Sequence, residues 1–265
     1  VRRGVQVRVV DQASEPMTTL DPDMGRLVHR VMEEIGIDVR TDTPVDGFEV
    51  GADGWGTGAG TAEGTLPADV VVLGIGVRPN AGLAADAGVP LGAYGGIRTD
   101  LRMRVPECDG VWAGGDCVEV RDLVSRSFVH VPLGTHANKH GRVIGTNIGG
   151  GYATFPGIVR TAVSKVCDLE IARTGLREKE ADRAGFAFLT QTVESTTRAG
   201  YYPGAEPLTV KMTAERRTGR LLGAQIVGRE GSAKRIDVLA LALWNAMTME
   251  ELTTVDLAYA PPFSP

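Results

Sequence analysis

The sequence predicts a mixed architecture: an α/β fold up to about residue 150, followed by a separate α+β fold. In the first part, the apolar strand VQVRVVD (5–11) precedes an amphipathic helix and a second short strand, the order typical of a βαβ unit. In the second part, strand-like blocks are separated by turns, with helices between and after them, which is typical of α+β domains. The glycine run at 149–151 marks the change.

Composition limits the classes of partner. The 265 residues are 43% hydrophobic and 23% charged, as in ordinary soluble globular proteins. A formal net charge of -5 argues against nucleic acid or an anionic membrane as a partner. No apolar run approaches the roughly 20 residues that span a bilayer. The three cysteines, Cys108, Cys117 and Cys167, form no CxxC pair, so we expect a reducing, cytoplasmic location.

The first part contains one clear helix and several strands. Asp21 is a candidate N-cap, Pro22 occupies the first helical position, and Gly36 ends the helix. IDVR (37–40) is a short strand, and a hairpin with a glycine-rich tip follows over 48–69. DVVVLGIGVRPN (69–80) then predicts a second buried strand that breaks at Gly74 and Gly76.

VWAGGDC (111–117) predicts a further buried strand, which ends in two glycines and one carboxylate. Ligands bind beyond the carboxyl edge of such strands. Gly114 and Gly115 would let a ligand approach the backbone closely, and Asp116 can accept hydrogen bonds from a polyhydroxylated chain such as the ribityl group of a flavin. A plain strand followed by a turn is the alternative. A helix is predicted over 133–148, and its N-terminal N–H groups favour an electron-rich ligand edge.

The second part contains mostly strands. The predicted strands lie within 161–175, 186–195, 208–216 and 221–228, and the predicted helices within 175–185 and 232–247.

In this order, DVVVLGIGVRPN, GGIRTD (95–100) and VPECDGVWAGGDC (105–117) resemble the flavin and pyridine-nucleotide disulfide oxidoreductases. The resemblance covers essentially the whole chain. It implies partial Rossmann-like domains, for NAD(P) over 1–77 and for FAD over 78–150, and an α+β dimerisation domain over 151–265. The cofactors implied are FAD and NADH, with NADPH possible. The residues implied to bind them are Gly74 and Gly76 for the nicotinamide dinucleotide, and Gly115, Asp116, Leu133, Gly134 and Thr135 for FAD.

Asp11 ends VQVRVVD, where a dinucleotide-binding unit places the acid that binds the adenosine ribose. An acid there favours NADH because it repels the 2′-phosphate of NADPH; a simple turn acid is the alternative. The glycine-rich GxGxxG loop that should precede it is absent. We therefore expect that the chain is a piece of a longer protein, with two such loops and a redox cysteine before Val1. Alone, it should bind FAD poorly and be inactive.

The segments RAGYYPGAEPLTVKM (198–212) and DLAYAPPFSP (256–265) resemble the coenzyme A-disulfide reductases and their relatives, the NADH oxidases, peroxidases and polysulfide reductases. This resemblance implies a homodimer formed through 151–265. It also implies that Tyr201 and Tyr259 serve the partner's thiol, since a phenol can donate a hydrogen bond or a proton to a thiolate. The alternatives are that Tyr202 points inward instead, and that Tyr259 only packs against the prolines beside it. Asn138 and Lys139 would touch substrate.

The predicted function is reduction of a small-molecule disulfide or thiol substrate, above all coenzyme A disulfide, by NAD(P)H through FAD. An NADH oxidase, peroxidase or polysulfide reductase on the same scaffold is the nearest alternative, and a non-catalytic dimerisation module is an alternative of another class. His136 and His140 have a metal-ligand spacing, but no HExxH motif or third ligand accompanies them, so no metal is expected.

Overall fold

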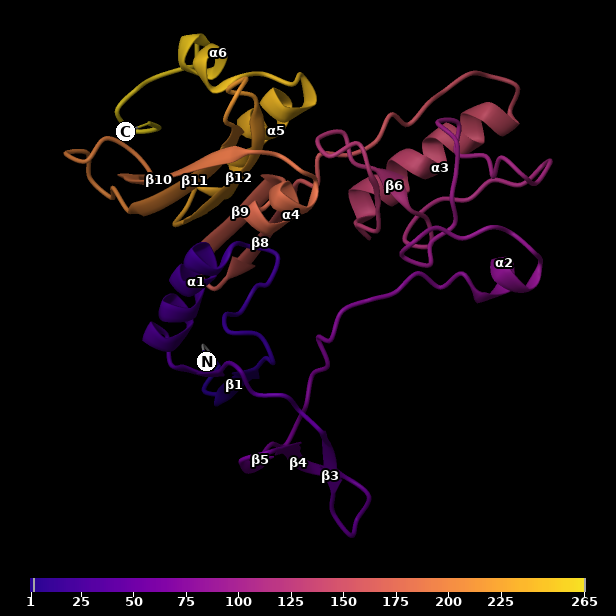
Figure 1. Ribbon diagram of the computed structural model, residues 1–265. Coiled ribbons are helices and arrows are strands. Elements are labelled where there is room, and N and C mark those ends of the chain that lie inside the picture. The colour runs from indigo at the N-terminus through magenta and orange to yellow at the C-terminus, as the bar shows by residue number, and fades with distance from the viewer. Residues whose placement is uncertain (2, 265) are drawn as a thin grey trace. The chain divides into compact units, whose positions relative to one another are not determined.

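The computed structural model describes residues 1 and 3–264. Arg2, in the predicted NAD(P) domain, and Pro265, in the predicted dimerisation domain, lie outside the described residues. The chain divides into two compact units (Figure 1). Unit 1 comprises residues 1–74, 162–242 and 247–265, and unit 2 comprises residues 75–161 and 243–246.

Unit 1 begins with the predicted βαβ arrangement. Strand β1 (Val7–Val10) pairs in parallel with β2 (Ile37–Arg40), and α1 (Pro22–Glu34) connects them. Asp21 occupies the N-cap position with extended backbone, as predicted, but its side chain does not cap the helix. Its carboxylate instead accepts hydrogen bonds from Gln225 Nε2 (2.6 Å) and the Glu178 N–H (3.1 Å). The prediction of Asp21 as the N-cap position is confirmed, but its side chain forms no hydrogen bond to the N-terminal N–H groups of α1.

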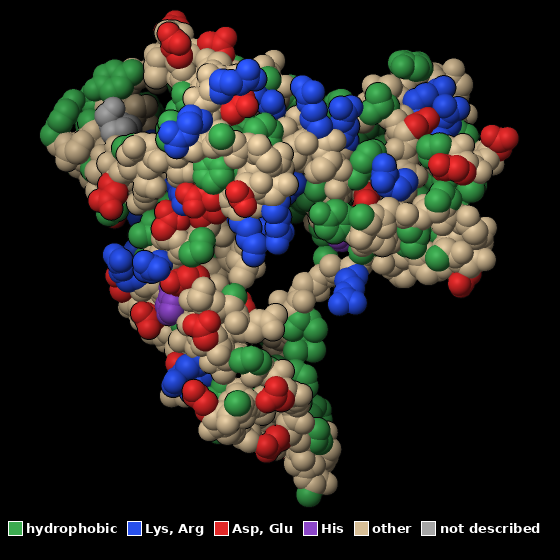
Figure 2. All heavy atoms as spheres, in the orientation of Figure 1, with side chains coloured by type: hydrophobic (Ala, Val, Ile, Leu, Met, Phe, Trp, Pro, Cys, Tyr) green, Lys and Arg blue, Asp and Glu red, His purple; other side chains and the backbone are tan. Residues whose placement is uncertain are grey.

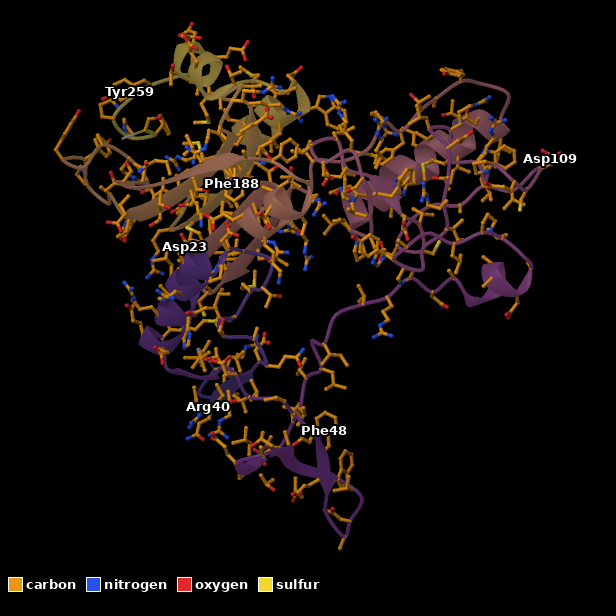
Figure 3. All side chains as sticks on the ribbon, viewed as in Figure 1. Asp23, Arg40, Phe48, Asp109, Phe188 and Tyr259 are labelled. Carbon is orange, nitrogen blue, oxygen red and sulfur yellow. The ribbon has the colours of Figure 1, made fainter. Side chains whose placement is uncertain are left out.

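The predicted hairpin over 48–69 is confirmed as a small antiparallel sheet. It contains β3 (Gly47–Val50), β4 (Gly56–Thr61) and β5 (Gly64–Pro67), with β4 in the centre. Hydrophobic side chains are visible on its surface in Figure 2, and Figure 3 labels one of them, Phe48. The sheet therefore has little apolar core of its own.

A five-stranded antiparallel sheet dominates the rest of unit 1. Its strands run in the order β10-β11-β12-β9-β8. They are β8 (Ala162–Val166), β9 (Leu169–Gly175), β10 (Phe188–Thr196), β11 (Pro207–Glu215) and β12 (Leu221–Gly228). The helices around them are α4 (Glu178–Arg183), the 3-10 helix η1 (Ala233–Arg235), α5 (Ile236–Trp244) and α6 (Met249–Thr254). The strands and the two helices predicted for this part are confirmed.

Both faces of this sheet are covered. On one face, Met24 and Val28 of α1 pack in one apolar cluster with Leu169, Ile171 and Val227. On the other face, Ile226 packs in a cluster with Ile236. Neighbouring residues of a strand point to opposite faces, so all eight residues of β12 are buried.

A buried ion cluster adds to the contact between α1 and the sheet. Lys211 of β11 is 3% exposed, and its Nζ lies 2.7 Å from Asp23 Oδ1, 3.1 Å from Glu178 Oε1 and 3.3 Å from Asp21 Oδ2. Asp23, labelled in Figure 3, stands in the first turn of α1. The segment before the helix is thereby tied to the central strands of the sheet.

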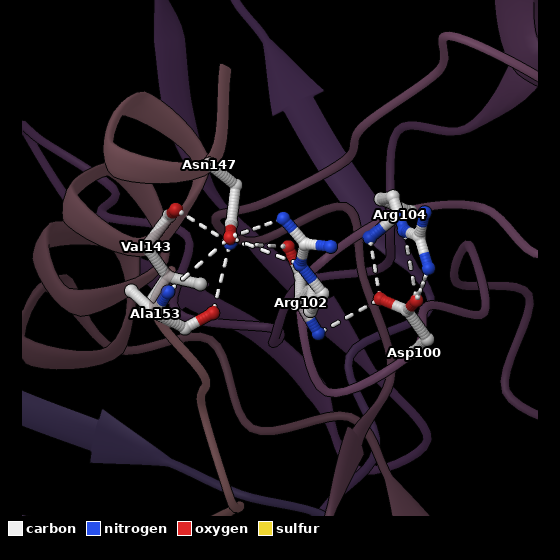
Figure 4. A network of polar contacts seen from close by, with 6 residues as sticks. All are labelled: Asp100, Arg102, Arg104, Val143, Asn147 and Ala153. Atoms are coloured by element: carbon white, nitrogen blue, oxygen red, sulfur yellow. Dashed lines mark hydrogen bonds and ion pairs between the residues drawn. The ribbon is translucent and has the colours of Figure 1, made fainter. Parts of the chain in front are cut away.

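Unit 2 contains short elements around one long helix. These are α2 (Gly82–Asp86), β6 (Val120–Arg121), β7 (Phe128–Val129) and α3 (Gly134–Ile148). Helix α3 confirms the prediction over 133–148, with Leu133 as N-cap and Gly149 as C-cap. Its last turn is fixed by Asn147, whose amide binds the Val143 and Ala153 carbonyls and the Arg102 guanidinium (Figure 4).

Two predicted strands are wrong for the described residues. The segment 69–80 forms no strand, and Val72 and Ile75 are each 87% exposed in it. Within 111–117 only Trp112 makes an isolated bridge, to Arg104. The reason is the same in both places: a strand needs a continuous partner ladder, and neither run meets one here. Among the described residues, no helix is long and apolar enough to cross a bilayer.

Candidate functional site

The turn at 114–116 lies directly against α3 within unit 2. Gly115 has φ +85°, and its N–H donates a hydrogen bond to His140 Nδ1 at 3.1 Å. A Cβ on Gly114 would lie 2.8 Å from Ile144 Cδ1 and 2.9 Å from the His140 Cβ. The absence of a side chain at Gly114 therefore accommodates the helix, which corrects the expectation that it admits a ligand. At Gly115 the nearest atom to such a Cβ is 3.9 Å away, so room remains there.

Asp116 presents an exposed side chain at the end of this turn. Its main-chain carbonyl accepts a hydrogen bond from His130 Nε2 at 2.8 Å, which fixes the backbone. Its carboxylate makes no hydrogen bond with any described residue. Its charge nevertheless raises the pKa of both His136 and His140, although burial, the largest effect, lowers both pKa values. The carboxylate is thus close to α3 and open to a hydroxyl-bearing ligand.

The N-terminus of α3 offers free backbone donors. Leu133 provides no side-chain cap, and the first turn holds no acid. Gly134 and Thr135 are exposed, and the helical hydrogen bonds begin only with the N–H groups of His136 and Ala137. The N–H groups of residues 134 and 135 can therefore bind an electron-rich ligand edge. Together with Gly115 and Asp116, these residues fit the ribityl chain and ring edge of a flavin.

His136 and His140 share a buried face of α3, as their spacing predicts. His136 Nδ1 bonds the Val131 carbonyl at 3.1 Å, and His140 Nδ1 bonds the Gly115 N–H. Both rings are therefore used to brace the fold. In the part of the chain that the structure describes, no group of three or more His, Cys, Asp or Glu side chains could hold a metal ion.

Asn138 and Lys139 occupy exposed positions one turn into α3. Lys139 contributes a positive charge that lowers the pKa of His136 and His140. Its charge therefore acts on the two histidines of its own helix. Substrate contact by these two residues stays a prediction.

The residues predicted for the nicotinamide dinucleotide lie in unit 1 and in the exposed segment that follows. Asp11 ends β1, and its Oδ1 accepts the Ala13 N–H at 2.9 Å, which closes an Asx turn. The Asp11 N–H donates to the Arg40 carbonyl, and the Asp11 carbonyl accepts from the Thr43 N–H. The Asx turn is what the alternative interpretation of Asp11 expects. No described residue donates a side-chain hydrogen bond to Asp11, and its contact with a ribose stays a prediction. Gly74 and Gly76 lie in exposed coil, where a Cβ on either residue would meet no atom within 4 Å.

Tyr201 and Tyr259 come together although 58 residues separate them in sequence (259 minus 201). Tyr201 follows β10, and Tyr259 lies in the C-terminal segment labelled in Figure 3. Slight desolvation and the neighbouring Tyr259 phenol raise the pKa of Tyr201. Both side chains are well exposed, at 78% and 65%, whereas Tyr202 is 36% exposed. The structure thus presents a coupled pair of phenols on a surface.

One arginine that holds this region, Arg235, carries no signal in the sequence. Arg235 donates to the carbonyls of Thr197 and Phe263, and so joins the tyrosine-bearing segments. Burial and the neighbouring Arg198 lower the pKa of Arg235. The contacts of Arg235 span 38 and 28 residues, so no local pattern could have indicated them.

Comparison with known protein families assigns both parts of the chain. Residues 1–141 match the model described as pyridine nucleotide-disulphide oxidoreductase. Residues 161–265 match the dimerisation domain of the same family. The chain belongs to the pyridine nucleotide-disulphide oxidoreductases. The predicted family and fold class are therefore confirmed, while the three-domain division and the roles of individual residues stay predictions.

Several oxidoreductases of this family are similar to the chain. An NADH oxidase of Methanocaldococcus jannaschii is 37% identical over 99% of this chain and 58% of its own length. An NAD(P)H coenzyme A polysulfide/persulfide reductase of Pyrococcus horikoshii is 40% identical over 77% of this chain and 46% of its own. The solved structure of an NAD-dependent persulfide reductase from A. fulgidus is 42% identical, with a TM-score of 0.94 over 98% of this chain and 48% of that one. The chain thus spans about half the length of the relatives it matches.

Proposed function

We propose that this chain is part of an FAD-dependent NAD(P)H oxidoreductase that reduces a sulfur–sulfur bond, with coenzyme A disulfide as its substrate. The observation that carries the proposal is the exposed Tyr201–Tyr259 pair, because it offers phenol donors on the family's dimerisation domain. A tyrosine of ordinary pKa, near 10, is already protonated at neutral pH, and the pKa of Tyr201 is raised above that value. A protonated phenol can donate a hydrogen bond to a departing coenzyme A thiolate.

In this proposal the chain acts as a homodimer through residues 151–265, and each tyrosine pair serves the thiol of the partner. Asp116, Gly115 and the α3 N-terminus (Leu133, Gly134 and Thr135) hold FAD. When bound, FAD supplies the redox chemistry between the nicotinamide and the disulfide. Asp11, Gly74 and Gly76 hold NADH, and Asn138 and Lys139 contact the substrate.

The test uses the protein produced from the complete gene. We expect NADH oxidation with coenzyme A disulfide, and a drop in kcat of at least about 10-fold in both Tyr259→Phe and Tyr201→Phe. The matched control is Tyr94→Phe, because Tyr94 is also an exposed tyrosine but lies in unit 2. This variant should retain wild-type kcat. Wild-type rates in both Tyr201→Phe and Tyr259→Phe would refute the role of the two tyrosines.

A second candidate is reduction of a persulfide or polysulfide. It is favoured by the names of two relatives, the P. horikoshii polysulfide/persulfide reductase and the A. fulgidus persulfide reductase, which are 40% and 42% identical to this chain. Rates with coenzyme A persulfide and coenzyme A disulfide, measured side by side, separate the two. Rapid NADH-dependent oxygen uptake without either substrate would favour an oxidase. A dimer that binds no flavin would favour the non-catalytic module.

A further inference from the structure

His140 has an unusual environment for a histidine on a long helix. It is 1% exposed, and its ring lies edge-on to the Phe155 ring with centroids 4.4 Å apart. Its Nδ1 faces the Gly115 N–H at 3.1 Å, and the other ring nitrogen, Nε2, is buried without a hydrogen-bond partner among the described residues. The ring thus makes a single polar contact, and that contact is with the turn that bears Asp116.

The hydrogen bond determines the protonation state of the ring. The Gly115 N–H can only donate, so Nδ1 must accept and carries no proton. The neutral ring then has its proton on Nε2. A protonated imidazolium would set two donors against each other at Nδ1 and break the bond.

The charges around His140 agree with this geometry. Burial, the charge of His136 and the charge of Lys139 lower its pKa, Asp116 raises it, and the result is a pKa of about 4. His140 is therefore neutral at physiological pH and available as an acceptor. It is also too poor a base to act as a proton carrier there.

Close packing leaves the turn little freedom. The His140 Cβ and Ile144 Cδ1 occupy the space beside Gly114, while Gly115 adopts the left-handed conformation. The hydrogen bond from Gly115 to His140 then fixes the direction in which the chain runs from Gly115 to Asp116. A turn held by packing alone could rotate about this peptide, whereas a bonded one has its orientation set.

We infer that His140 is a positioning residue, whose imidazole holds the Gly115 peptide and so aims the Asp116 carboxylate at the flavin ribityl chain. This inference rests on the proposed FAD site. It assigns the histidine a structural task toward the cofactor rather than the metal-binding task that its spacing with His136 suggests.

The test compares three variants of the complete gene product. His140→Leu keeps an apolar side chain but accepts no hydrogen bond. His140→Asn places an amide oxygen at the position of Nδ1, where it can accept from the Gly115 N–H. Val143→Ala removes buried volume from the same helix but leaves the side chain that accepts from Gly115 in place, and is the matched control for lost packing. The readouts are the FAD dissociation constant of the apoprotein, from flavin fluorescence, and amide hydrogen exchange over residues 111–117.

We expect His140→Leu to weaken FAD binding by at least 10-fold, which is about 1.4 kcal/mol, and to speed exchange at 111–117. His140→Asn should stay within about 3-fold of wild type, a rescue that a purely structural role would not require. Val143→Ala should lose stability but bind FAD normally. Should His140→Leu fail to fold, His140→Met replaces it, since its flexible side chain adapts to irregular space.

The outcomes separate the two proposals. Wild-type FAD affinity and wild-type exchange in His140→Leu would overturn the positioning role. Equal losses in His140→Leu and His140→Asn would also overturn it, because shape and not the hydrogen bond would then matter. A wild-type protein that binds no FAD would refute the proposed function, and the exchange rates would still decide whether His140 holds the turn.

Discussion

Two apolar runs of the same character have opposite structures in this molecule. LLGAQIVG (221–228) forms β12 and is buried at all eight positions. DVVVLGIGV (69–77) forms no strand, and its valines, leucine and isoleucine are exposed. Both runs are rich in aliphatic residues, and both contain glycine. Intrinsic strand propensity therefore does not distinguish them.

The difference lies in what surrounds each run. β12 pairs with β11 along one edge and β9 along the other, and it is covered on one face by α1 and on the other by Ile236. The run at 69–77 pairs with no strand among the described residues. A strand is stabilised by its neighbours, because its backbone groups and alternating side chains need partners on both edges and both faces.

The strongest test of this comparison removes the charge that ties α1 to the sheet. Burial alone would lower the pKa of Lys211, but hydrogen bonds to Asp23 and Glu178 raise it above 10.5. Lys211→Met leaves the buried Asp21 carboxylate without its cation, so we expect a loss of about 3 kcal/mol in the free energy of unfolding. Chemical denaturation at pH 7 measures it.

The exposed Lys165, 3.9 Å from Glu170, provides the control, and Lys165→Met should change stability by less than about 0.5 kcal/mol. Since the folded-state pKa of Lys211 is raised, its contribution is complete below pH 10.5 and is lost as the pH rises above that value. The difference in free energy of unfolding between wild type and Lys211→Met should therefore become smaller above pH 10.5. A difference in free energy of unfolding below about 1 kcal/mol at pH 7 would show that the ion cluster around Lys211 does not hold α1 to the sheet.

Matched glycine substitutions compare the two runs directly. A Cβ at Gly223 in β12 would lie 2.0 Å from the Leu176 carbonyl oxygen, so Gly223→Ala forces the backbone apart. We expect a loss of about 2 kcal/mol or more, as for other overpacked sites. Gly74→Ala in the exposed run meets no atom within 4 Å and should leave the unfolding midpoint in denaturant unchanged. Equal effects of the two substitutions would contradict the contrast in packing.

The fold was predictable from sequence where local signals and tertiary contacts agree. Helix α3 begins and ends where Leu133 and Gly149 predict, and the strands of the five-stranded sheet fall at their predicted segments. The runs at 69–80 and 111–117 were mispredicted, because an apolar pattern reports the tendency to be buried and not the presence of a partner ladder. Asp21 was found as the N-cap position, but its partners Gln225 and Glu178 lie 204 and 157 residues away in sequence, beyond the reach of any local pattern.

The candidate site was predictable in its parts and not in its arrangement. The sequence pointed to Asp116 and to the start of α3, but not to the contact between them through His140. The same four-residue spacing that suggested a metal pair places His136 and His140 on the buried face of the helix. Only three-dimensional packing shows that one of these rings accepts a hydrogen bond from Gly115. The segments that bear Tyr201 and Tyr259 are likewise joined by long-range contacts, from Arg235 to the Thr197 and Phe263 carbonyls.

The smallest expected effect is at the exposed run itself. Val72→Thr and Ile75→Thr each replace a side chain that is 87% exposed, so in the 265-residue chain they should change the free energy of unfolding by less than about 0.5 kcal/mol. The same substitutions in the complete gene product decide what the run becomes when more of the protein is present. A loss there of about 1 kcal/mol or more per site would mean that the run is a buried strand with partners from elsewhere, and that only the lack of those partners separates it from β12. An equally small effect in both proteins would mean that the run is a surface segment by nature, so that its apolar residues serve contact with a ligand or another chain.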